Sequence, residues 1–149
     1  MKLGFASDHR GYKLKDELIK YYKSNYQIID CGTNSNESCD YPVYAYKLGK
    51  LIVNKEIDFG IAICGSGVGI SIACNKINGV YCAKVNSFEE AIHTRLDNNT
   101  NCVAFGENVS INEAIKIVDA FINTEYSNLE KHNRRNKLVK DIENGDYND

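Results

Sequence analysis

The sequence predicts an α/β fold, with one domain over residues 1–149 built as a three-layer α/β/α sandwich around a five-stranded, Rossmann-like parallel sheet. Three observations predict this fold class. Short apolar runs that end at turn residues alternate with amphipathic stretches of helix length. A chain of 149 residues has the usual size of a single globular core. Polar or glycine-rich segments follow the apolar runs, which is where ligands bind in parallel sheets.

The amino-terminal part supplies two strands and two helices. Residues 2–6 are a short apolar run and predict the first strand, and residues 12–22 carry apolar side chains at helical spacing. Residues 26–30 predict the second strand. A polar loop then leads to Pro42, the only proline, which suits the first turn of a helix.

The middle of the chain continues the alternation. Residues 59–64 predict a third strand that runs directly into a glycine-rich turn and a short helix through Asn75. Residues 80–85 predict the fourth strand. Ser87 is placed to cap the next helix, with Glu90 three residues later completing a capping box.

The carboxyl-terminal part closes the fold with residues 101–105 as the fifth strand, a helix over residues 111–123 and a charged helix over residues 133–143. No window approaches the roughly 20 apolar residues that span a bilayer, so no membrane association is expected.

Composition excludes several classes of protein. Eighteen basic and twenty acidic residues give a net charge of −2, so wrapping of nucleic acid by bulk charge is not expected and any anion needs a local cluster. The six cysteines include no C-x-x-C pair, so no zinc site or other metal site is expected. The amino terminus lacks the apolar region of a signal peptide, which predicts a cytoplasmic protein with reduced thiols.

The glycine loop after the third strand is the most specific feature. Gly65, Gly67 and Gly69 alternate with Ser66 and Val68, so successive N–H groups can point into one hollow that binds an oxyanion or phosphate. The spacing differs from a dinucleotide-binding fingerprint, and the lysine of a P-loop is missing. A tight turn without a ligand is the alternative interpretation.

Cys64 immediately precedes this loop, at the amino-terminal side of the short helix. The free amides and the helix dipole there favour the thiolate, which would serve as a base or nucleophile. A buried cysteine with only a packing role is the alternative.

Polar side chains also follow the other predicted strands. Asp8 and His9 come after the first, Tyr41 lies beyond the second, and Asn108 follows the fifth. The carboxyl ends of parallel strands share one edge, so we expect these side chains near the glycine loop.

The final helix offers a separate basic cluster. Lys131 and Arg135 lie one turn apart on a common face, which suits a phosphate, although a solvated helix face has the same pattern. Asn98, before the fifth strand, could bond sugar hydroxyls or form a turn.

Three segments together resemble a known family: Ser7-Asp8-His9-Arg10-Gly11, then Asp40-Tyr41-Pro42, then the run from Cys64 to Ala73 followed by Asn75-Lys76. In this order and spacing they resemble the ribose-5-phosphate isomerase B family, which also contains galactose-6-phosphate isomerase subunits. The resemblance extends from the first strand to the final helix.

The resemblance implies an aldose–ketose isomerase of the pentose phosphate pathway that interconverts ribose 5-phosphate and ribulose 5-phosphate through an enediolate. It implies no metal or organic cofactor. Cys64 is implied as the base, with Ser66 and the loop amides holding the enediolate oxygen. The implied substrate contacts are Asp8, His9, Tyr41, Gly65, Gly67, Val68, Gly69, Asn98, Asn108, Lys131 and Arg135.

Three residues depart from the family pattern. Asp97 stands where ribose-type members have a histidine that donates a proton on ring opening, and Asn108 and Lys131 stand where members have arginines. One explanation keeps the isomerase, with Asp97 as the acid and Arg10 and Arg134 as cations. A second is an isomerase of another sugar phosphate, such as galactose 6-phosphate or allose 6-phosphate. A third is a non-catalytic sugar-phosphate or nucleotide-binding protein.

Family members are homodimers or dimers of dimers whose sites are built from both chains. The resemblance therefore implies at least a dimer, with the final helix near the dimer interface.

Overall fold

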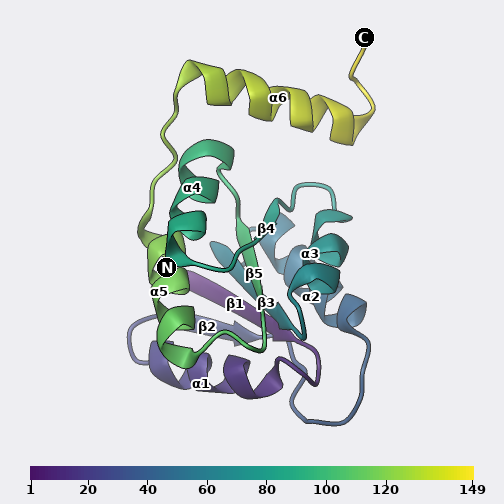
Figure 1. Ribbon diagram of the computed structural model, residues 1–149. Coiled ribbons are helices and arrows are strands. Elements are labelled where there is room, and N and C mark those ends of the chain that lie inside the picture. The colour runs from purple at the N-terminus through teal and green to yellow at the C-terminus, as the bar shows by residue number, and fades with distance from the viewer.

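A computed structural model describes residues 1–149 and shows one five-stranded sheet in the order β2-β1-β3-β5-β4, with every pair of neighbours parallel (Figure 1). The predicted α/β class and parallel sheet are confirmed. Because successive crossovers leave β1 toward opposite edges, the winding reverses between β1 and β3, which is where ligands bind in such sheets. The strands are β1 (Lys2–Ser7), β2 (Gln27–Asp30), β3 (Phe59–Cys64), β4 (Cys82–Lys84) and β5 (Cys102–Gly106).

Five helices cover the two faces of the sheet, and a sixth lies apart beyond the end of α4 (Figure 1). Helices α1, α4 and α5 pack on one face and α2 and α3 on the other. No helix combines the length and the apolar character that a bilayer span requires. The helices are α1 (Tyr12–Tyr22), α2 (Tyr41–Val53), α3 (Val68–Asn75), α4 (Phe88–Asn98), α5 (Ile111–Asn123) and α6 (Glu130–Asn144).

The central strands send large and small side chains to different faces. Leu3 and Phe5 of β1 are fully buried against α1 and α5, while the alternating Gly4 and Ala6 face α2. A Cβ atom at Gly4 would lie 2.8 Å from the Leu48 side chain, so glycine is what lets α2 approach the sheet closely.

The predicted bounds of β1, β2 and β5 differ from the observed ones by one residue at an end, whereas the fourth strand and the final helix differ by more. The fourth strand is shorter than predicted. The Val80 N–H donates to the Ile77 carbonyl at 3.0 Å and the Tyr81 N–H donates to Asn101 Oδ1 at 2.9 Å, so these two residues do not join the β ladder. The final helix begins at Glu130 and ends at Asn144, so it is longer than the predicted span of residues 133–143 and includes Lys131.

The predicted cap of α4 is present, with a small change in its second bond. The Glu90 N–H donates to Ser87 Oγ at 3.3 Å, as expected for an N-cap. The Glu90 carboxylate accepts from the Asn86 N–H at 2.6 Å, one residue before the position that a capping box would use.

Candidate active site

The loops that follow β1, β3 and β5 meet over the carboxyl end of β3. The Asp8 N–H donates to the Ile63 carbonyl at 3.3 Å, and the Glu107 N–H donates to the Gly65 carbonyl at 3.2 Å. A Cβ atom at Gly11 would lie 2.5 Å from the Ile63 carbonyl oxygen, so the turn after β1 presses directly on β3. These contacts bring the three predicted loops together at the switch point of the sheet.

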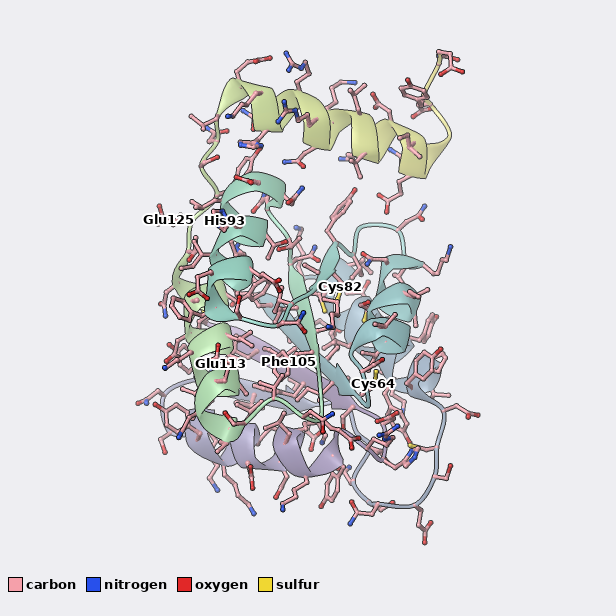
Figure 2. The ribbon with its side chains drawn as sticks, in the orientation of Figure 1. Cys64, Cys82, His93, Phe105, Glu113 and Glu125 are labelled. Atoms are coloured by element: carbon pink, nitrogen blue, oxygen red, sulfur yellow. The ribbon has the colours of Figure 1, made fainter.

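The glycine loop depends on Gly67 for its shape. Gly67 is the N-cap of α3 and has a φ of 80°, in the left-handed region that favours glycine. A Cβ atom there would also lie 2.7 Å from the backbone carbonyl carbon of Phe105. The end of β5, labelled at Phe105 in Figure 2, therefore forms a wall behind the loop.

Cys64 lies at the base of this loop and is only 4% exposed. Its Sγ accepts a hydrogen bond from the Gly67 N–H at 3.2 Å. The N–H groups of Gly65, Ser66 and Gly69 donate to no protein atom, so they are available to a bound oxyanion. The Gly67 amide, expected among the oxyanion donors, thus bonds the sulfur instead.

Ser66 keeps a free donor in the same loop. Its Oγ accepts from the Val68 N–H at 3.1 Å, and this leaves the hydroxyl hydrogen to point elsewhere. The side chain of Val68 is exposed beside it. A Cβ atom at Gly69 would lie 2.7 Å from the Tyr41 ring, so Tyr41 covers the first turn of α3.

Asp8 and His9 lie beside this loop and are partly engaged already. Asp8 Oδ1 accepts from the N–H groups of Arg10 and Gly11, each at 3.0 Å, and its second oxygen has no partner. His9 Nδ1 accepts from the Cys39 N–H at 3.2 Å. A neutral His9 therefore carries its proton on Nε2.

Arg10 spans the site from the β1 loop to the β5 loop. Its Nε donates to Glu107 Oε2 at 2.7 Å and its second nitrogen to Oε1 at 3.2 Å. The guanidinium lies against Gly65, where a Cβ atom would be 2.9 Å from it. The hydrogen bond and the charge of Glu107 raise the pKa of Arg10, and the charges of Asp8 and Cys64 act in the same direction.

Asn108 lies on the β5 side of the glycine loop. It lines a surface pocket of about 550 Å³ together with Gly65 and Ser66. Lys84 reaches the same pocket from the end of β4 and donates to Asn86 Oδ1 at 2.5 Å. Sequence reasoning missed Lys84, although the rule that site residues follow strand ends would have found it.

The remaining predicted residues lie at the other edge of the sheet. Asp97 and Asn98 end α4 just before β5 begins, whereas Cys64 is the last residue of the parallel strand β3. The five residues of β5 separate these edges by roughly 16 Å. Within one chain, the structure therefore does not bring Asp97 and Asn98 to Cys64.

Asp97 instead contacts the start of α6. Its Oδ1 lies 3.3 Å from His132 Nε2, and its backbone carbonyl accepts from Asn136 Nδ2 at 2.9 Å. His132 was not among the predicted site residues. The sequence offered one indication of a role for His132, which is its position between Lys131 and the other basic residues of the final helix.

The cations of α6 differ in whether an acidic residue neutralises them. Arg134 pairs with Glu130 at 3.7 Å, and Lys137 pairs with Asp141 at 2.8 Å. Lys131, Arg135 and Lys140 form no salt bridge, and the first two lie one turn apart, so they can bind one external anion together.

A buried thiol beside unpaired amides, at the switch point of a parallel sheet, defines the class of protein that moves a proton next to a developing oxyanion. Comparisons with known proteins agree with this class. A family model described as Ribose/Galactose Isomerase matches residues 3–139. The chain belongs to this family, which confirms the resemblance drawn from the three segments.

Individual relatives match over nearly their full length. Ribose-5-phosphate isomerase B of Escherichia coli is 39% identical over 144 residues, covering 95% of this chain and 96% of that protein. The Clostridium thermocellum ribose-5-phosphate isomerase B structure has a TM-score of 0.94 and 39% identity, covering 97% of this chain and 99% of that one. The Mycoplasma genitalium enzyme, solved with bound ribulose-5-phosphate, has a TM-score of 0.89 and 33% identity, covering 96% of each chain.

Proposed function

We propose that this protein is an aldose–ketose isomerase that interconverts ribose 5-phosphate and ribulose 5-phosphate. The observation that carries the proposal is the buried Cys64 sulfur beside the unpaired amides of Gly65, Ser66 and Gly69. A protein that only binds a sugar phosphate has little need of a base at that position. The relatives named ribose-5-phosphate isomerase B support this choice of substrate.

The proposed chemistry is a proton transfer between neighbouring carbons. The Cys64 thiolate removes the C2 proton of the open-chain aldose, and negative charge develops on the oxygen at C1. The free amides and the Ser66 hydroxyl donate to that oxygen, each well-placed donor stabilising the transition state by about 3–4 kcal/mol. The hydroxyl proton then passes from the oxygen at C2 to the oxygen at C1, and return of the carbon-bound proton to C1 gives the ketose, an internal exchange that needs no external electron acceptor.

The sugar contacts are assigned by position. Asp8 and the Nε2 side of His9 lie beside the loop and are placed to bond hydroxyl groups, with Tyr41 closing the hollow over Gly69. Asn108 borders the same loop from the β5 side.

Lys131 and Arg135 are assigned to the phosphate because no acidic side chain of the chain neutralises them. Asp97 is assigned to ring opening as the proton donor, with Asn98 bonding the sugar beside it. The His132 imidazole, 3.3 Å from the Asp97 carboxylate, is the group that can pass a proton to it.

The two halves of the site are proposed to come from two copies of the chain. Four of the assigned residues lie about a strand length or more away from Cys64, so a second copy must supply them: Asp97, Asn98, Lys131 and Arg135. Apolar side chains on neighbouring helices α2 and α3 are exposed beside the Cys64 half, and others are exposed on α6. We therefore place α6 at the interface of a homodimer or dimer of dimers; the exposed residues are Val43, Tyr46, Val68, Ile72, Leu138, Val139 and Ile142.

We also propose that the protein works in the cytoplasm. All six cysteines are free, and a reducing compartment keeps the Cys64 thiol available as a base.

The activity is tested by solvent deuterium exchange at C1 and C2, followed by NMR, across pentose and hexose phosphates. The expected result is exchange with ribose 5-phosphate that Cys64→Ala abolishes. Exchange with a hexose phosphate only would reassign the substrate. Saturable binding without any exchange would replace the isomerase with a binding protein.

The shared site is tested by mixing Cys64→Ala with Arg135→Ala at a sugar phosphate concentration far below the raised KM of Arg135→Ala, where neither variant alone turns over appreciably. If each site takes Cys64 from one chain and Arg135 from the other, a mixed dimer keeps one intact site. Random reassociation then recovers about one quarter of the wild-type activity. No recovery would place both residues in a site made by a single chain.

A further inference from the structure

Three cysteines outside the candidate active site meet in the core between the sheet and α3. Cys74 lies in the last turn of α3, Cys82 begins β4 and Cys102 begins β5. Their sulfur atoms all lie within 4.8 Å of one another, and the residues are 0%, 9% and 0% exposed. Cys64 lies at the opposite end of α3, as the two labelled cysteines in Figure 2 show.

Secondary structure fixes the positions of the three sulfurs. Cys82 and Cys102 are direct partners in the parallel pairing of β4 and β5. The Asn75 side chain accepts from the Cys82 N–H and donates to the Cys82 carbonyl, both at 2.8 Å, which ties β4 to the end of α3. Gly60 leaves room on the other side, because a Cβ atom there would lie 3.2 Å from Cys102 Sγ.

The size of this cluster suits one ion bound by three thiolates. A metal–sulfur bond of about 2.3 Å places ligand sulfurs roughly 4 Å apart, which is inside the observed limit. No fourth cysteine, histidine or carboxylate joins these three sulfurs within that distance. The larger buried side chains of the same core cluster are apolar, namely Leu48, Ile52, Ile70 and Val80. A four-coordinate ion such as Zn²⁺ would be left with an unfilled position.

The charge of three thiolates narrows the choice of ion further. Three thiolates around a monovalent or divalent ion would leave a net negative charge in this apolar core, which is costly without a cation nearby. Three thiolates around a trivalent ion are neutral.

We propose that Cys74, Cys82 and Cys102 form a trithiolate site for a trivalent, three-coordinate soft ion of the arsenic(III) class. Arsenous acid would exchange its three hydroxyl groups for the three sulfurs. Three As–O bonds break, three As–S bonds form, and the three thiol protons leave as water, with no change of oxidation state. The lone pair of arsenic(III) takes the place of a fourth ligand.

The site also has an entry path. Cys82 lines a groove of about 870 Å³ that runs between α6 and the amino-terminal end of β4 and β5. An ion can therefore reach one sulfur from solvent and the other two by a small local opening. Binding is expected to be slow, because Cys74 and Cys102 are completely covered.

The test is titration of the full-length protein with arsenite, read by native mass spectrometry and by the ultraviolet absorption of As–S bonds. The expected product is one arsenic per chain with loss of three hydrogens. Cys74→Ala, Cys82→Ala and Cys102→Ala each abolish that product, whereas the matched controls Cys31→Ala and Cys39→Ala retain it. Circular dichroism shows which variants are folded, and refolding the wild-type protein with arsenite removes the access barrier.

Three results would overturn the proposal. The first is no adduct after refolding with arsenite. The second is an adduct that has lost fewer than three hydrogens, or that persists when Cys74 is replaced. The third is tighter binding of Zn²⁺ or Cd²⁺ than of arsenite at the same sulfurs, which would refute the charge argument.

Discussion

Replacing Gly67 with alanine tests whether the glycine loop is held by the end of β5. The change adds one methyl group at a residue whose φ is 80°. That methyl would lie 2.7 Å from the Phe105 carbonyl carbon and 2.8 Å from its Cα, and both are backbone atoms that cannot rotate away. The loop must therefore move, and the Gly67 N–H must leave the Cys64 sulfur.

The expected cost has two parts. An alanine in the left-handed region costs about 1–2 kcal/mol, and forcing a methyl group against fixed atoms adds about 1–3 kcal/mol. Gly67→Ala should therefore lower the free energy of unfolding by about 2–5 kcal/mol. Gly145→Ala is the matched control, because Gly145 has a φ of 76° and a Cβ atom there would meet nothing within 4 Å. Gly145→Ala should lower the free energy of unfolding by no more than about 1–2 kcal/mol, the cost of the left-handed backbone alone.

Urea denaturation followed by circular dichroism measures both variants against the wild-type protein. Isomerase turnover gives a second readout, in which we expect Gly67→Ala to lose about 100-fold because the oxyanion donors shift and Gly145→Ala to stay near wild type. Equal losses of stability in the two variants would show that backbone conformation alone matters and that β5 does not support the loop.

Three further predictions follow from contacts described above. Arg135→Ala should raise KM for the sugar phosphate much more than Arg134→Ala does, since Arg134 is already paired with an acidic residue; equal KM values would remove α6 from the site. Asp97→Asn should lower kcat on the cyclic sugar while sparing the open-chain form, and an unchanged kcat would transfer the acid role to another group. Burial and the hydrogen bond to Glu143 raise the pKa of Tyr81 to about 12. Because an unfolded tyrosine titrates near pH 10, this stabilisation is complete below about pH 10 and is lost as the pH rises toward 12. Tyr81→Phe should therefore flatten the fall of Tm between pH 10 and 12, and an unaltered slope would contradict the assignment.

The sequence predicted the class of fold and most of its elements because apolar periodicity is a local property. The bounds of residues 12–22, 59–64 and 111–123 were confirmed to the residue. The fourth strand was predicted too long because its first residues, Val80 and Tyr81, bond to a turn and to a side chain distant in sequence. The strand order likewise depends on which crossover passes over which face, and no local pattern encodes that choice.

The candidate site was predictable where it follows strand ends and not where it depends on side-chain partners. Cys64 and the glycine loop stand in one continuous segment. The pairing of Arg10 with Glu107 joins residues 97 positions apart, and the contact of Asp97 with His132 joins the ends of two helices. Such contacts depend on packing between elements, so only the folded structure shows that Arg10 is already neutralised by a carboxylate.

All of the proposed oxyanion donors except the Ser66 hydroxyl belong to the main chain, and this has a consequence for how the site can change. Backbone amides do not titrate and are not removed by substituting a side chain, so substitutions outside the glycine loop leave the unpaired N–H groups of Gly65, Ser66 and Gly69 in place. Asn108 and Lys131 can therefore replace the arginines of the family pattern while the glycine loop keeps its donors. Substitutions can therefore change which sugar the protein prefers without removing the groups that carry out the proton transfer.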